Sequence, residues 1–244
     1  MKMKSFHYIK ASACIMTICA ILCAVLIISN PNKSPSVPTI IEETKPITVI
    51  IDAGHGGEDG GTQSADGTLE KDLNLDIALR LCELLKKQGV NVILTRESDT
   101  LLYDRNTDYK GRKKLLDAEA RLKIANDNPD AIFVSIHQNA FSSPQYSGLQ
   151  VWYSGNNASS LPLAEAIQLS VKTTLQPENN RAVKLSGSNV YIMQHIKNPA
   201  VLIECGFLSN PTEAKKLSDP SYRQNLSQVI CDAIIGYLIN VASS

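Results

Sequence analysis

The sequence has no excess of charge of either sign, because 24 Lys and Arg residues balance 24 Asp and Glu residues. Without a basic surplus there is no global positive field, and we expect no nucleic-acid partner. Internal repeats are also missing, and the length of 244 residues suits one ordinary domain with a tail. The composition therefore favours a single globular domain.

Cysteine is present but lacks the spacing of a disulfide framework, since the six cysteines include no CxxC pair. Three lie in an apolar run near the N-terminus, and the others are Cys82, Cys205 and Cys231. We expect free thiols that behave as small buried hydrophobes. Cys205 lies beside Glu204, where a nucleophile or ligand role is conceivable, but packing is the favoured interpretation.

Signatures of nucleotide binding are missing as well. The segment 54–57, Gly-His-Gly-Gly, resembles a phosphate-binding loop, but Asp59 occupies the third glycine place of a GxGxxG motif. The Lys-Ser/Thr pair of a P-loop is not found beside it. A nucleotide site is therefore not favoured.

The N-terminal segment has the pattern of a targeting device. Three lysines precede an apolar run at 11–28, and no small-x-small cleavage site follows it. We interpret residues 1–29 as a signal or membrane anchor, with an uncleaved anchor favoured, and 30–46 as an extended linker rich in Pro and Ser. The folded domain, 47–244, is then expected outside the cytoplasmic membrane, with the membrane as a partner of the N-terminal segment.

The folded domain opens with a strand–helix–strand pattern. Residues 47–51 form a β-branched run typical of a buried strand, 69–88 have helical spacing, and 90–95 form a second apolar run. Thr68 is the expected N-cap of the helix, which places Glu70 in its first turn. Short joints between such elements are typical of a right-handed βαβ unit.

The same alternation continues to the C-terminus. Further strands are expected at 131–136, 149–153, 190–193 and 200–204, and further helices at 113–125, 161–175 and 222–241. Polar loops at 97–110 and 176–188 separate some of them, and the second could border a cleft. The pattern predicts an α/β fold, a single sandwich domain with a twisted, mostly parallel sheet flanked by helices.

Polar side chains stand at or just beyond the ends of three buried strands. His55 follows the first, His137 the third, and Glu204 closes the last, while Glu70 lies at a helix start. Ligands of open α/β sheets bind outside the carboxyl ends of the strands, so these four residues are expected to converge there. Any one of them alone would be explained as a core residue whose hydrogen bonds are satisfied. His195, which lies in a polar turn, is likewise given no functional role.

Two imidazoles and a carboxylate are a common ligand set for catalytic Zn²⁺, with a fourth position left for water. We predict His55, Glu70 and His137 as zinc ligands, and the metal would lower the pKa of its water to about 7. Glu204 is then the general base and acid that takes the proton of that water and passes it to the leaving nitrogen. A carboxylate that closes a hydrophobic run is expected to have a perturbed pKa.

Other functions fit the same residues less well. Glu70 and Glu204 could form the carboxylate pair of a glycosidase, but two strand-end histidines would then have no role. Asp52 and Asp59 are more simply interpreted as residues that structure the loop than as metal ligands.

Several blocks together resemble the zinc-dependent N-acetylmuramoyl-L-alanine amidases. The blocks are 49–57 (VIIDAGHGG), Glu70, 135–140 (SIHQNA) and 201–210 (VLIECGFLSN), with Thr95-Arg96, Arg121 and Ala125-Asn126 between them. The resemblance covers 47 to about 237. It implies zinc binding at His55, Glu70 and His137, catalysis by Glu204, and hydrolysis of the amide between N-acetylmuramic acid and L-alanine in peptidoglycan.

A narrower resemblance, carried by 176–181 and 187–191, is to the sporulation amidases of this family. It implies removal of peptide from muramic acid in the spore cortex before muramic-δ-lactam forms, in the space between the forespore membranes, with an accessory sporulation protein as a further candidate partner. The loop 176–188 could contact glycan or peptide stem, or be an ordinary solvated connection. A peptidoglycan-binding scaffold without turnover and a zinc peptidase that cuts within the stem are the alternative functions.

Overall fold

The computed structural model describes residues 47–104, 106 and 109–242, so the expected anchor at 1–29 and the expected linker at 30–46 lie outside the described residues. The strands are β1 (Thr48–Ala53), β2 (Asn91–Leu94), β3 (Ile132–Asn139), β4 (Gln150–Tyr153), β5 (Lys184–Leu185) and β6 (Ala200–Phe207). The helices are α2 (Glu70–Lys87), α3 (Lys113–Asn126), α4 (Ser160–Thr174), α5 (Tyr191–His195), α6 (Pro211–Ser218) and α7 (Pro220–Ala242).

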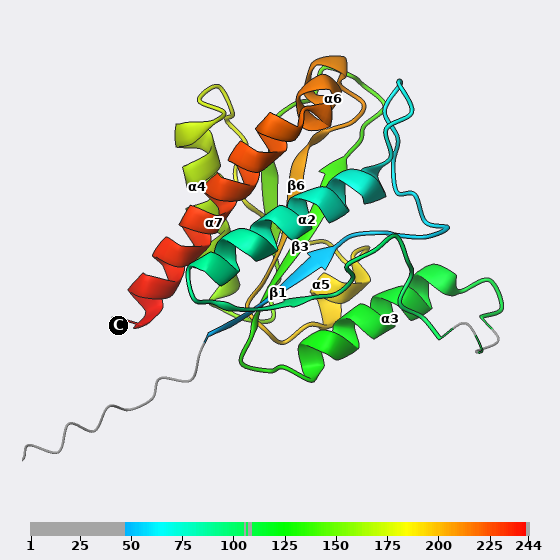
Figure 1. The fold of residues 1–244 in the computed structure, drawn as a ribbon, viewed down its shortest axis with the longest axis vertical. Coiled ribbons are helices and arrows are strands. Elements are labelled where there is room, and N and C mark those ends of the chain that lie inside the picture. Colours follow the sequence, from blue (N-terminus) through cyan, green and yellow to red (C-terminus); the bar gives the residue numbers. More distant parts are fainter. Residues whose placement is uncertain (1–46, 105, 107–108, 243–244) are drawn as a thin grey trace, which may run out of the picture. The chain divides into compact units, whose positions relative to one another are not determined.

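The six strands form one mixed sheet in the order β2-β1-β3-β6-β4-β5. All neighbouring strands are parallel except β4 and β6, which are antiparallel. Helices cover both faces: α2, α4 and α7 lie over one, and α3 and α5 over the other (Figure 1). The predicted α/β sandwich with a mostly parallel sheet is confirmed.

Both faces of the central strands are buried, as the β-branched sequence of β1 predicts. Val49 and Ile51 pack in the core cluster under α2, α4 and α7, whereas Ile50 lies in the cluster under α3 and α5. In β6, Ile203 packs in the first cluster and Leu202 in the second. This alternation fixes the register, because a shift by one residue would move every side chain to the other face.

The start of α2 differs from the sequence expectation. Thr68 is not the N-cap; the N-cap is Leu69, which makes no side-chain capping bond. The hydroxyl of Thr68 instead donates to Asp66 at 3.0 Å within a tight turn that begins at Ser64. Glu70 still lies in the first turn, as predicted.

The expectation for residues 190–193 is wrong, since they belong mainly to the short helix α5 rather than a strand. Gln194 N donates to the Val190 carbonyl and Ile196 N to that of Ile192, which closes the helical turns. Met193 and Ile196 are buried in the core cluster under α3 and α5. An apolar run this short does not distinguish a strand from one turn of buried helix.

Helix α6 was not predicted from the sequence. Asn210 caps this helix by accepting hydrogen bonds from the backbone N–H groups of Thr212 and Glu213, with Pro211 in its first turn. Asn followed by Pro is a helix-start signal that we interpreted only as a loop.

Helix α7 is long and apolar enough to cross a membrane by length and composition alone. Half of its most apolar 18-residue stretch is buried inside the domain. The helix packs there against α2 and α4. This is the environment of a core helix.

Candidate metal centre

His55 lies in the loop that follows β1, in a strained backbone conformation. Its φ is +62°, a left-handed value that costs a non-glycine residue roughly 1–2 kcal/mol. Two contacts hold it there: Arg121 Nη2 donates to the His55 carbonyl at 2.7 Å, and Asp59 Oδ2 lies 2.8 Å from His55 Nδ1. Backbone strain of this kind persists where surrounding contacts over-determine it, and it is typical of functional sites.

Glu70 is buried, with 3 % of its surface exposed. Its Oε2 accepts a hydrogen bond from Thr62 N at 2.8 Å, and its Oε1 accepts one from Gln138 N at 3.0 Å. Asn74, one turn further along α2, approaches Oε1 at 3.4 Å. The carboxylate is thus fixed by the backbone on two sides.

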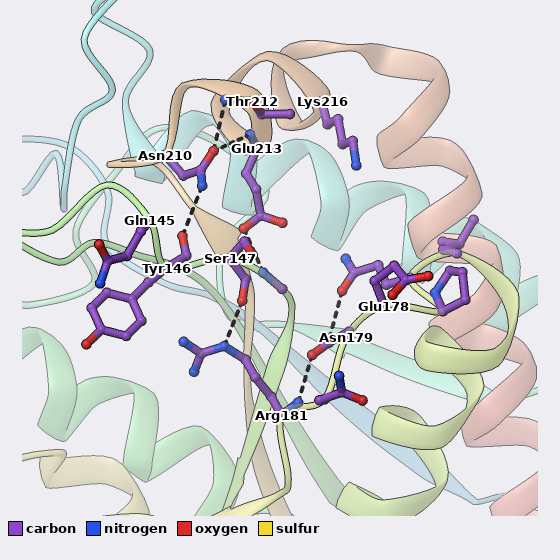
Figure 2. A pocket seen from close by; sticks show the side chains of 15 residues that line it. Gln145, Tyr146, Ser147, Glu178, Asn179, Arg181, Asn210, Thr212, Glu213 and Lys216 are labelled. Atoms are coloured by element: carbon purple, nitrogen blue, oxygen red, sulfur yellow. Dashed lines mark hydrogen bonds between the residues drawn. The ribbon is translucent and has the colours of Figure 1, made fainter.

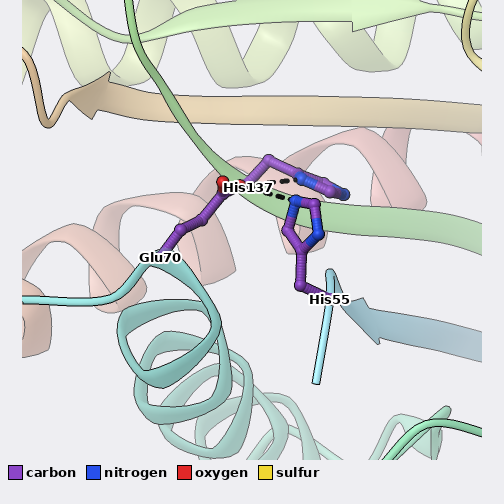
Figure 3. A group of neighbouring side chains, drawn as sticks. All are labelled: His55, Glu70 and His137. Carbon is purple, nitrogen blue, oxygen red and sulfur yellow. Dashed lines mark hydrogen bonds and ion pairs between the residues drawn. The ribbon is translucent and has the colours of Figure 1, made fainter. Parts of the chain in front are cut away.

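The structure brings His55, Glu70 and His137 together from β1, α2 and β3 (Figure 3). Glu70 Oε1 lies 3.2 Å from His55 Nε2 and 3.0 Å from His137 Nδ1. One candidate ligand atom from each residue lies within 4.8 Å of the others. This arrangement of two nitrogens and one carboxylate oxygen is consistent with a metal site, and its donor set fits zinc.

Two glycines leave room for these side chains. A Cβ at Gly54 would lie 2.3 Å from Nε2 of His137. A Cβ at Gly61, where φ is +68°, would lie 2.4 Å from Oε2 of Glu70 and 2.7 Å from Cδ2 of His55. Any larger residue would displace a candidate ligand, so the backbone is shaped around the cluster.

The charges in the cluster support one another. Burial acts to raise the pKa of Glu70, but the hydrogen bonds from His137 and His55 outweigh it and hold that pKa well below its usual range. Burial acts to lower the pKa of His55, but Glu70 and Asp59 raise it to about 8. Glu70 is therefore ionised at neutral pH, as a metal ligand must be.

Glu204 lies on β6 directly opposite His137 on β3. Its Oε2 is buried and, among the described residues, accepts no hydrogen bond. Burial raises the pKa of Glu204 to about 7. A carboxyl group with this pKa can both accept and return a proton near neutral pH.

The histidines and Glu204 face a cavity of about 270 Å³ between the sheet edge, α3 and α5. Val190, Tyr191 and Ile192 form one of its walls. No functional role was predicted for these residues, because a strand was expected there.

Asp52 and Asp59 were predicted to structure the loop, but their contacts behind the candidate ligands were not predicted from the sequence. Asp59, which was interpreted as a loop residue, contacts Nδ1 of His55 through Oδ2. Its Oδ1 forms an ion pair with Lys114 Nζ at 2.9 Å. Asp52 is 1 % exposed and bonds to Arg121 at 2.6 Å and to the Ser135 hydroxyl at 2.6 Å. The sequence pattern that indicates the contact of Asp59 with His55 is an acidic residue four positions after a histidine in a glycine-rich loop.

Arg96 and Arg121 also hold the loop that follows β1. The sequence indicated them only as part of the family resemblance. Arg96 donates to the carbonyls of Ala53 at 2.8 Å and Gly54 at 3.0 Å. Arg121 donates to the Ala53 carbonyl at 2.7 Å, beside its bond to His55. The two arginines thus bind the carbonyls at the end of β1, and Asn74 also donates to the Gly54 carbonyl at 3.1 Å.

The remaining candidates have structural roles. Cys82, Cys205 and Cys231 are free and buried, as predicted. Burial raises the pKa of the Cys205 thiol far above neutral pH, which makes it a poor nucleophile. His195 Nδ1 contacts the Tyr191 carbonyl at 2.8 Å and its ring stacks on that tyrosine, away from the cluster.

Comparison with known proteins agrees with this geometry. The profile of the N-acetylmuramoyl-L-alanine amidase family matches residues 49–236. The germination-specific N-acetylmuramoyl-L-alanine amidase of Bacillus subtilis is 39 % identical over 189 residues, which covers 78 % of each chain.

Solved structures are similar over most of the chain. The CwlD amidase of Clostridioides difficile, solved in complex with the GerS lipoprotein, is 40 % identical, with a TM-score of 0.74 over 79 % of this chain and 98 % of that one. An N-acetylmuramoyl-L-alanine amidase of Clostridium difficile 630 is 32 % identical, with a TM-score of 0.68 over 79 % of this chain and 97 % of that one.

Proposed function

The chain belongs to the N-acetylmuramoyl-L-alanine amidase family of hydrolases, and we propose that it is a zinc enzyme that cuts the amide between N-acetylmuramic acid and L-alanine in peptidoglycan. The observation that carries this proposal is the convergence of His55, Glu70 and His137 beside Glu204 at one edge of the sheet.

His55, Glu70 and His137 would hold the Zn²⁺ ion. When bound, such an ion polarises the scissile carbonyl and lowers the pKa of a coordinated water. The bond between Asp59 and His55 Nδ1 leaves Nε2 of His55 facing Glu70. Asp59 therefore orients the imidazole of His55 for metal binding even when no metal ion is bound.

Glu204 would carry the proton. Its pKa of about 7 allows the carboxylate to accept a proton from the attacking water and to donate it to the leaving alanine nitrogen. Its unpartnered Oε2 is available for both transfers. Burial of the carboxyl group is the main cause of this raised pKa.

The biological setting is a finer proposal. The relatives include a germination-specific amidase and an amidase solved with a lipoprotein. We propose that this chain likewise acts in maturation of the spore cortex, leading to muramic-δ-lactam, and that an accessory protein assists it. Residues 1–29 would anchor it outside the cytoplasmic membrane, in the space where the cortex forms.

Mass spectrometry of muropeptides tests the bond that is cut. Purified protein with added zinc should release intact stem peptides that begin with L-alanine, and chelator should stop the release. Glu204→Ala should keep its zinc but lose activity by about 10²–10⁴-fold. Products cut between stem amino acids would indicate a peptidase instead, and glycan binding without any release would indicate a scaffold.

A further inference from the structure

A row of side chains continues from Glu204 across the sheet, away from the two histidines. Glu204 on β6 pairs with His137 on one side and with Gln150 of β4 on the other. Residues directly opposite each other on neighbouring strands point to the same face of the sheet. The Gln150 side chain therefore shares the face of Glu204.

Arg181 extends this row by one residue. Its Nη1 donates to Gln150 Oε1 at 2.7 Å, its Nε donates to the Ser147 carbonyl at 2.8 Å, and its guanidinium lies 4.6 Å from the centre of the Phe207 ring. Within the described part of the chain, none of its hydrogen bonds uses Nη2. The guanidinium is thus held in one position with donor capacity left over, as in sites that bind carboxylates.

Arg181 also lies at the edge of a cavity of about 570 Å³ that does not include the metal cluster (Figure 2). Tyr146 lines the same cavity, and its ring lies 6.3 Å from that of Phe207 and 4.8 Å from that of Phe141. Tyr146 is 40 % exposed and Phe141 is 55 % exposed. Exposed aromatic side chains beside a fixed cation are typical of a binding surface.

Two acidic residues, Glu178 and Glu213, also line this cavity, and Glu213 is already engaged. Its Oε2 accepts hydrogen bonds from the backbone N–H groups of Gly148 and Phe207, each at 2.9 Å. Lys216, on the next turn of α6, adds a second positive charge to the lining. The two basic residues of the lining are matched by two carboxylates, so an anion would be placed here by the fixed guanidinium of Arg181 and not by the net charge of the cavity.

We propose that Arg181 binds a free carboxylate of the peptide stem, two or three residues beyond the amide that is cut. This inference rests on the proposed function. The backbone of Gln150 lies one strand spacing, about 4.8 Å, from that of Glu204. The guanidinium of Arg181 lies beyond it, in contact with the Gln150 side chain. A path on the order of 10 Å corresponds to about three residues of extended peptide at 3.3–3.6 Å each.

Matched substrates test this assignment. Two soluble muropeptides differ only in the α-carboxyl group of the second stem residue, which is free in one and amidated in the other. A second pair carries the same change on the third residue. The wild-type protein is expected to prefer the free carboxylate of one pair by about 10- to 100-fold in kcat/KM, the range of one charge-assisted hydrogen bond.

Arg181→Gln should abolish this preference by raising KM for the free carboxylate, with kcat unchanged. Arg181→Lys should keep part of it, because the charge remains but the planar fork is lost. Lys184→Gln is the control, since Lys184 is an exposed residue of β5 whose side chain lies over Trp152, and it should keep the full preference.

The inference fails if the wild-type protein treats all four substrates alike, or if Arg181→Gln slows both members of a pair equally, which would make Arg181 a structural residue. If the wild-type protein loaded with zinc releases no stem from any substrate, the proposed function itself is wrong and the inference falls with it. Thermal unfolding of each variant shows whether it is folded.

Discussion

At the scale of single residues, the candidate metal site depends on the groups behind its ligands. Asp59 holds Nδ1 of His55 and is itself paired with Lys114. Loss of such a supporting carboxylate typically costs 10- to 100-fold in metal affinity. We therefore expect Asp59→Asn to weaken zinc binding by about that factor, measured by competition with a chromophoric chelator.

Asp72→Asn is the matched control, because Asp72 lies exposed in the first turn of α2. Its zinc affinity should equal that of the wild-type protein. An unchanged affinity in Asp59→Asn would show that the His55 ring is positioned by other contacts.

Glu204 gives a prediction for the pH dependence of stability in the metal-free protein. Burial raises its folded pKa to about 7, above the unfolded value of about 4.3. The folded state then binds more protons than the unfolded state between these values, so this group lowers stability as pH rises. Glu204→Gln should remove a penalty of at most about 4 kcal/mol that is complete above pH 7 and absent below pH 4.

Denaturant unfolding of chelator-treated protein at pH 4 and pH 8 measures this difference. The variant and the wild-type protein should differ only at the higher pH. Equal stabilities at pH 8 would mean that Glu204 ionises freely and lacks the environment of a proton carrier.

The convergence of the four candidate site residues could be predicted from the sequence, because three of them follow or close apolar runs and one lies at a helix start. His137 and Glu204 nevertheless lie inside β3 and β6 and not at the ends of these strands.

The contacts of their supporting residues could not be predicted. Asp52 and Arg121 act through a contact between residues 69 positions apart, and no local pattern shows which acid a buried arginine will meet. Asp59 lies only four positions from His55, but the sequence alone does not show that its side chain turns toward the imidazole. Arg181 belonged to a polar loop whose role the sequence left open.

At the scale of elements, a buried ion-pair network joins β1 to α3. Arg121 is 2 % exposed and bonds to Asp52 at 2.6 Å and Asp117 at 2.7 Å. Removal of one partner leaves buried charges without compensation, which typically costs 3–5 kcal/mol. Arg121→Ala is expected to lose about this much free energy of unfolding, measured by denaturant titration.

Helix α3 supplies its own control. Lys123 forms an ion pair with Asp127 at 2.7 Å, but both side chains are more than half exposed. Exposed pairs of this spacing contribute about 0.3–0.5 kcal/mol, so Lys123→Ala should change stability by no more than that. A loss in Arg121→Ala as small as in the control would show that the network is not needed to join these elements.

Element prediction succeeded where periodicity was long and failed where it was short. Helices α2, α4 and α7 span at least 15 residues each, and their apolar stripes were visible. Helix α5 has five residues, too few to show a period. Strand β3 runs to Asn139 rather than ending at Ile136, because its polar residues still pair with β6 through a bulge.

At the scale of the whole molecule, the candidate metal site joins segments that are far apart in the sequence. Its candidate ligands come from the loop after β1, the start of α2 and from β3. A metal that binds only the folded protein stabilises it by about 2.7 kcal/mol when free zinc is at 100 times its dissociation constant. For a domain of this size, that corresponds to a Tm increase of roughly 5–10 °C.

Thermal unfolding with chelator and with restored zinc measures this linkage. The wild-type protein should gain stability on zinc addition, whereas His137→Ala, which lacks one ligand, should not. An equal gain in both proteins would place the stabilising zinc elsewhere.

The most direct measurement is anomalous diffraction at the zinc absorption edge from crystals grown with zinc. We expect a peak about 2.0–2.2 Å from a nitrogen of His55, a nitrogen of His137 and an oxygen of Glu70. Zinc density elsewhere, with these three side chains still joined only to one another, would contradict the metal centre and the hydrolytic function built on it.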